Sequence, residues 1–237
     1  MTLERSIALV TGAGRGIGKA IATTLARNGA TVVLTARTMS DLEAVQKEIE
    51  SSDGKALCIP ADLTNDNQIE KLFDEVSSRL HRLDILVNNA GIGVFSPVKE
   101  LSVEDFDGMW RLNMRAVFLC AQKAISIMEP QKSGMIVNVS SLAGKNAFVG
   151  GAGYSATKWA LLGFSKTLML EVRENNIRVI TICPGSVDTS FSAQEKDPKR
   201  SEKILHPQDV ADTVLAAIML PERAMVSEID IRPTNPK

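Results

Sequence analysis

Short apolar runs alternate with longer segments of helical periodicity along the whole chain. Short runs of aliphatic and β-branched residues are typical of buried strands. The expected strands are Ser6–Val10, Thr31–Thr35, Ala56–Ile59, Asp84–Val87, Met135–Val139, Ile177–Ile182 and Val226–Ile231. The expected helices are Gly16–Asn28, Ser40–Ser51, Gln68–Leu80, Val103–Met128, Tyr154–Arg173 and Pro207–Met219. Ser40 is the expected N-cap of the second helix, and Pro130 marks the expected end of the fourth.

This alternation places the chain in the α/β class. Strands separated by helices of a dozen or more residues pair in parallel through right-handed crossovers. The pattern therefore predicts a doubly wound, seven-stranded parallel sheet with helices on both faces. With 237 residues, 44% of them hydrophobic and 23% charged, we expect a single domain over residues 1–237.

Charge and cysteine usage exclude several kinds of partner. The net charge of −1 gives no general attraction to nucleic acid or to an anionic membrane. No signal peptide and no apolar stretch long enough to span a bilayer can be found. Cys58, Cys120 and Cys183 lie far apart, which predicts free thiols in a cytoplasmic protein. His81 and His206 are too few and too scattered for a zinc site, so no metal is expected.

A glycine-rich loop, Thr11–Gly18, joins the first strand to the first helix. The free backbone N–H groups and positive dipole at that helix start would bind a pyrophosphate. Gly12 permits the tight turn, Gly16 leaves room for the phosphates, and Gly18 lets the helix pack close to the strand. This context favours a dinucleotide site over a simple turn.

The end of the second strand favours NADP(H) over NAD(H). An NAD site places an acid about twenty residues after the glycines, where it binds the ribose 2′-hydroxyl. This chain has Ala36 there, followed by Arg37, whose guanidinium suits a 2′-phosphate, and Arg15 would approach from the glycine loop. The nearest acid, Asp41, belongs to the following helix.

Tyr154 and Lys158 lie four positions apart, on one face of a helix. A neighbouring ammonium would lower the tyrosine pKa from about 10, so that the phenol exchanges a proton with a carbonyl or alcohol oxygen. Ser141 lies thirteen residues before Tyr154, at the end of a strand, where its hydroxyl would hold the substrate oxygen. The adjacent Ser140 lacks that spacing.

These motifs together resemble those of the short-chain dehydrogenase/reductase family in its compact single-domain form, over nearly the whole chain. The matching motifs are Thr11–Gly18, Asp62-Leu63, Asn88-Asn89-Ala90-Gly91, Asn113, Ser141, Tyr154 with Lys158, and Pro184-Gly185 with Thr189. The resemblance implies a Rossmann-like fold and a catalytic set of Asn113, Ser141, Tyr154 and Lys158.

The resemblance also assigns roles to single residues. Asp62 would contact the adenine, Asn89 would stabilise the sheet near the cofactor, and Asn113 would support a water chain that reprotonates Tyr154 through Lys158. The Pro184–Thr189 loop would cover the nicotinamide amide. The expected cofactor contacts are Gly12, Gly14, Arg15, Gly16, Ile17, Gly18, Arg37, Asp62, Leu63, Asn89, Ala90, Gly91, Tyr154, Lys158, Pro184, Gly185, Val187 and Thr189.

The C-terminal tail departs from the family pattern. Members that resemble 3-oxoacyl-carrier-protein reductases often end in a glycine-rich, acidic tail that joins a subunit interface, whereas this chain ends Glu228–Lys237 without one. A homodimer through Val103–Met128 and Tyr154–Arg173 is expected by resemblance, with a tetramer as the alternative.

Three functions remain open. The first is an NADPH-dependent reductase of a small ketone or aldehyde, with an apolar pocket lined by Val94, Phe95, Leu142, Phe148, Val149 and Phe191. The second is a 3-oxoacyl-thioester reductase, in which Lys196, Lys199, Arg200 and Lys203 would meet an acidic carrier. The third is a non-catalytic NADP-sensing protein. The polar segment Thr189–Leu205 is expected to form a mobile lid over the substrate.

Overall fold

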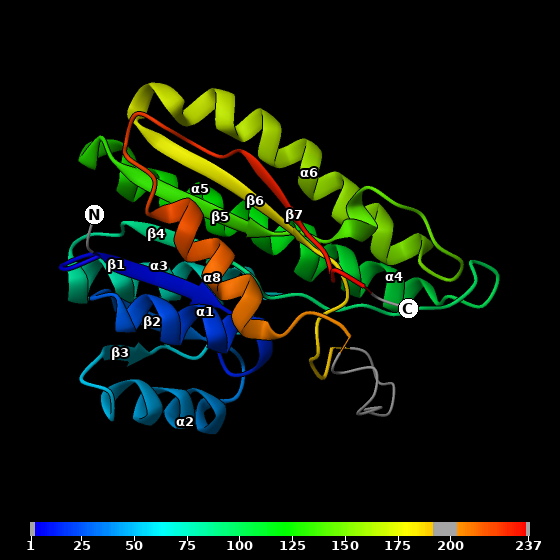
Figure 1. The fold of residues 1–237 in the computed structure, drawn as a ribbon, viewed down its shortest axis with the longest axis horizontal. Helices are drawn as coiled ribbons and strands as arrows, with labels where there is room; N and C mark the ends of the chain where they lie inside the picture. The colour runs from blue at the N-terminus through cyan, green and yellow to red at the C-terminus, as the bar shows by residue number, and fades with distance from the viewer. Residues whose placement is uncertain (1–2, 192–202, 236–237) are drawn as a thin grey trace.

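The expected strands form one parallel sheet in the computed structural model, which describes residues 3–191 and 203–235 (Figure 1). The strand order is β3-β2-β1-β4-β5-β6-β7, so the chain winds outward from β1 in both directions. The strands are β1 Ile7–Thr11, β2 Thr31–Thr35, β3 Lys55–Cys58, β4 Ile85–Asn88, β5 Gly134–Val139, β6 Ile177–Pro184 and β7 Glu228–Ile231. The predicted seven-stranded, doubly wound sheet is confirmed.

Helices cover both faces of this sheet. The helices are α1 Gly16–Arg27, α2 Met39–Glu50, α3 Asp66–Leu80, α4 Val103–Trp110, α5 Ala116–Gln131, α6 Ala152–Val172 and α8 Pro207–Ile218. The described residues also form short helical turns, which are η1 Arg111–Arg115, η2 Leu142–Gly144 and η3 Arg173–Asn175. Within the described part of the chain, no helix combines the length and the apolar character needed to cross a membrane.

Two apolar cores lie on opposite faces because successive strand residues point to opposite sides. Helices α1, α2 and α8 pack over one face, where they meet side chains such as Val10 and Val137. Helices α3, α5 and α6 pack over the other face, against side chains such as Leu9 and Ile136. The uninterrupted apolar runs of β1 and β5 follow from this burial on both sides.

A buried polar chain connects the middle of the sheet to α6. Asn88 on β4 donates to Asn138 on β5 at 2.9 Å, and Asn138 donates to Ser165 on α6 at 2.8 Å. A buried amide that lost its partner would cost about 1–3 kcal/mol, so these bonds favour one register of α6 against the sheet. That register determines where the amino-terminal half of α6 meets the ends of the strands.

Most boundaries differ from the sequence prediction by one to three residues, and three helices show larger or more informative differences. The expected helix Val103–Met128 is divided by η1, a π-helical turn, and Pro130 lies inside the last turn of α5. Helix α2 begins after Thr38, so Ser40 is not its N-cap. Helix α6 begins two residues before Tyr154, because packing carries the helix through a glycine-containing stretch of low intrinsic propensity.

Candidate active site

The loops that follow β1, β4, β5 and β6 meet at the carboxyl edge of the sheet. Parallel strands bring their carboxyl ends to one edge, where open α/β sheets bind ligands. Here the glycine loop contacts Asn89, which follows β4, and Thr189, which follows β6. The turn after Ser141, which follows β5, packs against α6. The sequence motifs therefore lie together in space.

The glycine loop has the backbone geometry expected for a phosphate site. Gly12 and Gly16 adopt φ values of +64° and +56°, which favour glycine. A Cβ on Gly18 would collide with the carbonyl oxygen of Gly12, so α1 packs as closely to β1 as the sequence predicts. No side chain caps the start of α1 after Arg15, which leaves backbone N–H groups there for a pyrophosphate.

Thr11 and Asn89 join the glycine loop to the end of β4. The Thr11 hydroxyl accepts hydrogen bonds from the backbone N–H groups of Asn89 and Ala90, both at 2.9 Å. The Asn89 side chain donates to the carbonyl oxygen of Thr11 at 2.8 Å. These bonds give Asn89 the geometry of a sheet-stabilising residue beside the expected cofactor, and they add Thr11, which the sequence analysis assigned only to the loop.

Charged groups surround the expected position of the adenosine half of the cofactor. Arg15 and Arg37 are both exposed there. The pKa of Asp62 is lowered, first by the backbone N–H of Thr64 and also by the charge of Arg37. Asp62 is thus near Arg37, and it is not a helix N-cap, because Asn65 caps α3.

Asp41 adds a carboxylate to the same region. Its Cβ lies 2.9 Å from the position that a Cβ on Gly14 would take, so the side chain rests against the glycine loop. The sequence places Asp41 on the following helix but does not show that this helix begins beside the loop. Arg15, Arg37 and Asp41 together determine the charge that a 2′-phosphate or a 2′-hydroxyl would meet.

The expected proton donor and its neighbours form one cluster. Tyr154 is buried on α6, and its phenol hydrogen-bonds with the Ser141 side chain from the end of β5. Lys158 places its Nζ 5.7 Å from the centroid of the Tyr154 ring and donates to the carbonyl oxygen of Val139 at 3.0 Å. Ser140 turns instead to the backbone of α6, where its hydroxyl lies 3.3 Å from the carbonyl oxygen of Lys158.

The expected direction of the Tyr154 pKa shift is wrong for this structure. Burial raises the pKa of Tyr154 to about 12, although its hydrogen bond with Ser141 opposes the rise. Burial also lowers the pKa of Lys158 to about 8, because the ammonium is removed from water. Desolvation of both groups therefore outweighs the effect of the i, i+4 spacing, and the phenol is held in its protonated form.

Asn113 is buried in η1 and connects two segments of the site. Its side-chain amide donates to the carbonyl oxygen of Ile92 at 2.8 Å, and its oxygen accepts from the N–H of Ile92 at 2.9 Å. The same amide donates to the Thr157 hydroxyl at 3.1 Å. The side chain thus holds the loop after β4 against α6. The expected support of a water chain by Asn113 stays a prediction.

The loop after β6 returns to the glycine loop. A Cβ on Gly16 would lie 3.3 Å from the Cγ2 of Thr189, so these expected cofactor residues are neighbours. Gly185 donates its N–H to Ile231 on β7 at 2.8 Å, and Val187 pairs with Leu205 in a parallel bridge. The segment just before the expected lid therefore pairs with Leu205, the last residue of the lid, whereas residues 192–202 lie outside the described part of the chain.

Aromatic rings line the space beside Tyr154. The rings of Phe95 and Phe191 lie with their centroids 5.5 Å and 5.7 Å from that of Tyr154, so two of the residues expected to line the pocket are its neighbours. Phe148 packs against Phe95 at 5.8 Å. Of the basic residues considered for an acidic carrier, Lys196, Lys199 and Arg200 lie outside the described residues.

Lys145 helps to hold the Ser141 loop in place, a role that the sequence alone does not reveal. It follows η2, directly after Ser141 and its turn, and forms ion pairs with Glu228 at 2.5 Å and with Asp230, both on β7. These carboxylates raise the pKa of Lys145 against the effect of burial. The loop that carries Ser141 is thereby attached to the edge strand. Only the three-dimensional pairing of β6 with β7 brings these groups together.

Comparisons with known proteins agree with this geometry. The family model described as short chain dehydrogenase matches residues 6–200. An uncharacterized oxidoreductase of Staphylococcus aureus strain USA300 is 36% identical over 231 residues, which cover 98% of each chain.

Solved structures are similar over the whole chain. A metagenomic short-chain oxidoreductase in complex with NADP is 36% identical, with a TM-score of 0.88 and 99% of each chain covered. A 7α-hydroxysteroid dehydrogenase in complex with NADH and 7-oxo glycochenodeoxycholic acid is 29% identical, with a TM-score of 0.90, and the match covers 99% of this chain and 95% of that one.

Proposed function

Because this chain belongs to the short-chain dehydrogenase family, we propose that it is an NADPH-dependent oxidoreductase that reduces a ketone or aldehyde. The observation that carries the proposal is the hydrogen bond between Ser141 and the phenol of Tyr154, beside the buried amine of Lys158. This cluster lies at the carboxyl edge of the sheet, next to a glycine loop with an uncapped helix start.

Each group in the cluster has a chemical task in this proposal. NADPH supplies the hydride to the carbonyl carbon when it is bound. Ser141 holds the carbonyl oxygen by a hydrogen bond, and Tyr154 gives that oxygen its proton. Lys158 holds the nicotinamide ribose and, while charged, favours the phenolate that remains. The raised pKa of Tyr154 favours reduction over alcohol oxidation near neutral pH, because the protonated phenol is the form that reduction needs.

NADP(H) is proposed over NAD(H) from the charges at the adenosine end. Arg15 and Arg37 are exposed where the 2′-phosphate would lie, and Ala36 leaves no acid at the end of β2. Asp41 acts against this preference, because its carboxylate rests on Gly14. Among the similar structures one holds NADP and another NADH, so the choice depends on these side chains.

NADPH oxidation with a panel of diketones, aldehydes and acetoacetyl thioesters tests the function. We expect reduction of an uncharged carbonyl compound, and Tyr154→Phe should lose nearly all turnover while it keeps NADPH binding. A clear preference for acetoacetyl thioesters would instead support a 3-oxoacyl-thioester reductase. Tight NADPH binding without turnover of any carbonyl compound would support an NADP-sensing protein and contradict the proposal.

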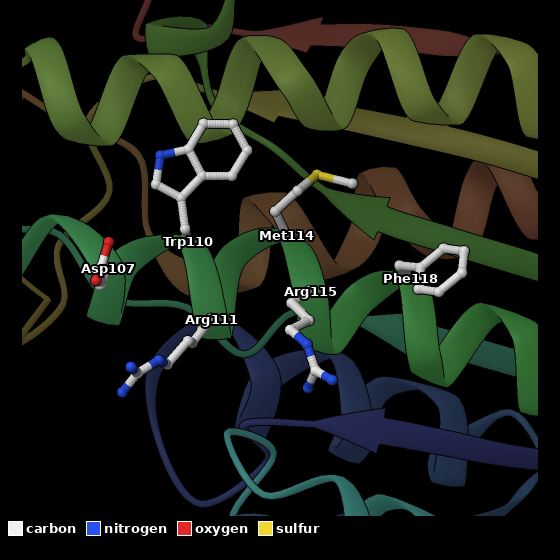
Figure 2. A pocket seen from close by; sticks show the side chains of 6 residues that line it. All are labelled: Asp107, Trp110, Arg111, Met114, Arg115 and Phe118. Atoms are coloured by element: carbon white, nitrogen blue, oxygen red, sulfur yellow. The ribbon is translucent and has the colours of Figure 1, made fainter.

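We further propose a homodimer, in a reducing cytoplasm that keeps the three cysteines free. The faces of α4, α5 and α6 expose large apolar side chains, and one surface hollow of 430 Å³ lies along α4, η1 and α5. The hollow is lined by Asp107, Trp110, Arg111, Met114, Arg115 and Phe118. In Figure 2, Arg111 and Arg115 extend to the side away from Trp110 and Met114. A second copy would cover the apolar part of this face.

A further inference from the structure

Three phenylalanine rings from three separate loops form a cluster beside the proposed proton donor, two of them against the Tyr154 ring and the third, Phe148, against Phe95. Phe95 follows β4, Phe148 precedes α6, and Phe191 follows β6. Phe95 meets the Tyr154 ring edge-on, at an interplanar angle of 81°, and Phe191 meets it at 57°. Tyr154 is buried, whereas Phe95, Phe148 and Phe191 are 45%, 47% and 42% exposed. The buried phenol therefore lies beneath a partly exposed aromatic surface.

Two glycines allow the rings to take these positions. A Cβ on Gly93 would lie 2.8 Å from the Phe191 ring and 3.0 Å from the Phe95 ring, so both rings close over the bare backbone of Gly93. A Cβ on Gly151 would collide with the ring of Phe148. The rings are thus packed on backbone at their inner side. Their outer side remains open to a ligand.

The exposed rings lie next to the phenol that would donate the proton, so the part of the ligand that covers them should be apolar and close to its carbonyl group. Large apolar side chains that remain exposed at one place mark a site that an apolar group covers. Aromatic rings bind a further ring more strongly than an aliphatic group of equal size, because edge-to-face and offset contacts add to burial. A ring close to the carbonyl would reach Phe95 and Phe191 while the carbonyl oxygen reaches Tyr154.

We propose that the substrate is an uncharged aryl ketone or aldehyde, with its aromatic ring on the carbonyl carbon or one carbon away. This inference rests on the proposed carbonyl reduction. The carbonyl carbon receives the hydride of NADPH, the oxygen receives the proton of Tyr154, and the products are the aryl alcohol and NADP⁺. Phe95, Phe148 and Phe191 are the specificity-determining residues. They take no part in the transfer of hydride or proton.

Phenylacetone and cyclohexylacetone test the inference, because they share a carbon skeleton and neither ring is conjugated with the carbonyl. We expect kcat/KM to favour phenylacetone about tenfold. Phe148→Leu and Phe95→Leu should each reduce this ratio severalfold, and Gly151→Ala, which displaces the Phe148 ring, should do the same. Phe118→Leu replaces a similarly exposed phenylalanine on α5 and should leave the ratio unchanged.

A binding measurement separates recognition from turnover. The protein with NADPH is titrated with 1-phenyl-2-propanol or 1-cyclohexyl-2-propanol in a calorimeter, since an alcohol and the reduced cofactor do not react. The aryl alcohol should bind more tightly, in wild type and in Tyr154→Phe. Equal kcat/KM for the two ketones, or equal affinity for the two alcohols, overturns the inference and leaves carbonyl reduction standing. If no carbonyl compound oxidises NADPH, the proposed function fails and this inference fails with it.

Discussion

At the residue scale, the ionisation of Tyr154 can be observed directly because it is the only tyrosine in the chain. We predict that the tyrosinate absorbance of the free protein appears only at a pH well above 10, because burial raises the pKa of Tyr154 to about 12. Adding NADP⁺ should shift the transition to lower pH, because the oxidised nicotinamide is cationic. Absorbance at 295 nm during a pH titration measures this.

The controls for this titration come from the same cluster. Tyr154→Phe should remove the transition and leave only the small background of Trp110 and Trp159. A free protein that titrates below pH 10 would contradict the dominance of burial over the hydrogen bond with Ser141. The raised pKa also affects stability. The unfolded chain releases the Tyr154 proton near pH 10, whereas the folded protein keeps it until about pH 12. The free energy of unfolding should therefore fall as the pH rises from 10 to 12.

Lys158 gives a second prediction, in which burial lowers the pKa and makes the protein more stable as the pH rises. Burial lowers its pKa from 10.5 to about 8, so the folded protein binds the ammonium form less readily than the unfolded chain does. Its contribution to stability is fully present above pH 10.5 and is lost as the pH falls to 8. Lys158→Met should therefore be more stable than wild type at pH 7, by up to about 3 kcal/mol.

Urea unfolding of Lys158→Met and wild type across this pH range tests the prediction. The gain in the free energy of unfolding should shrink as the pH rises from 8 to 10.5. A gain that does not depend on pH would show that packing, and not the buried charge, separates the two proteins. The same variant should lose turnover, because it lacks the amine proposed to hold the ribose and support Tyr154.

Arg37 gives a third prediction at this scale. Arg37→Ala should weaken NADPH binding at least tenfold and leave NADH binding nearly unchanged, since a charge-assisted hydrogen bond contributes about 1.5–3 kcal/mol. Fluorescence titration with both cofactors measures the ratio. Arg223→Ala, at an exposed arginine between α8 and β7, is the matched control. Equal affinities of wild type for NADPH and NADH would contradict the proposed cofactor preference.

At the scale of elements, the sequence predicts the strands and most helices because burial on both faces leaves a strong hydrophobic pattern. It misses the π-helical turn η1, since no local signal distinguishes this turn from a continuous helix. The loop partners of Asn113 and the ion pairs of Lys145 are missed for another reason. They join segments far apart in the chain, and only the packed fold brings them together.

The pKa of Tyr154 shows the same limit within the site. The four-residue spacing to Lys158 correctly predicts that the two side chains are neighbours. Spacing carries no information on how deeply α6 buries them, and that depth determines the sign of the shift. Motif spacing therefore predicts which groups meet, whereas their ionisation depends on the surrounding packing.

The close packing of α1 against β1 gives a prediction for a whole element. Gly18→Ala places a Cβ against the carbonyl oxygen of Gly12, so α1 must shift and the free energy of unfolding should fall by about 1–3 kcal/mol. NADPH affinity should fall as well, because the start of α1 moves. Gly163→Ala is the matched control. Within one chain its Cβ meets no described atom within 4 Å, so in the monomer it should stabilise α6 by about 0.5–1 kcal/mol.

Thermal unfolding with and without NADPH measures both glycine variants. If Gly18→Ala is as stable as wild type and binds NADPH equally well, close packing of the strand and helix is not needed at this position. A destabilised Gly163→Ala would indicate that the exposed side of α6 at this position is covered in solution. That outcome would support an interface that includes α6.

At the scale of the whole molecule, α4, α5 and α6 expose large apolar side chains that nothing in the described part of the chain covers. Val103, Phe118, Trp159 and Leu170 are 76%, 46%, 54% and 57% exposed. Phe118 packs with Phe164, at 6.2 Å between ring centroids, which joins α5 to α6 at the surface. A pair of long helices from each of two copies can bury the roughly 1,600 Å² of a standard interface.

We predict that the protein sediments as a dimer at micromolar concentration and that Phe118→Glu shifts it toward the monomer. The introduced carboxylate would be buried without a partner in a two-fold interface, and both copies would carry it at once. Met225→Glu, at a residue 36% exposed between α8 and β7, introduces the same charge elsewhere and should leave the dimer intact. Analytical ultracentrifugation of wild type, Phe118→Glu and Met225→Glu measures their oligomeric states. A monomeric wild type would contradict the dimer, and a Phe118→Glu variant that stays dimeric would move the interface to another face.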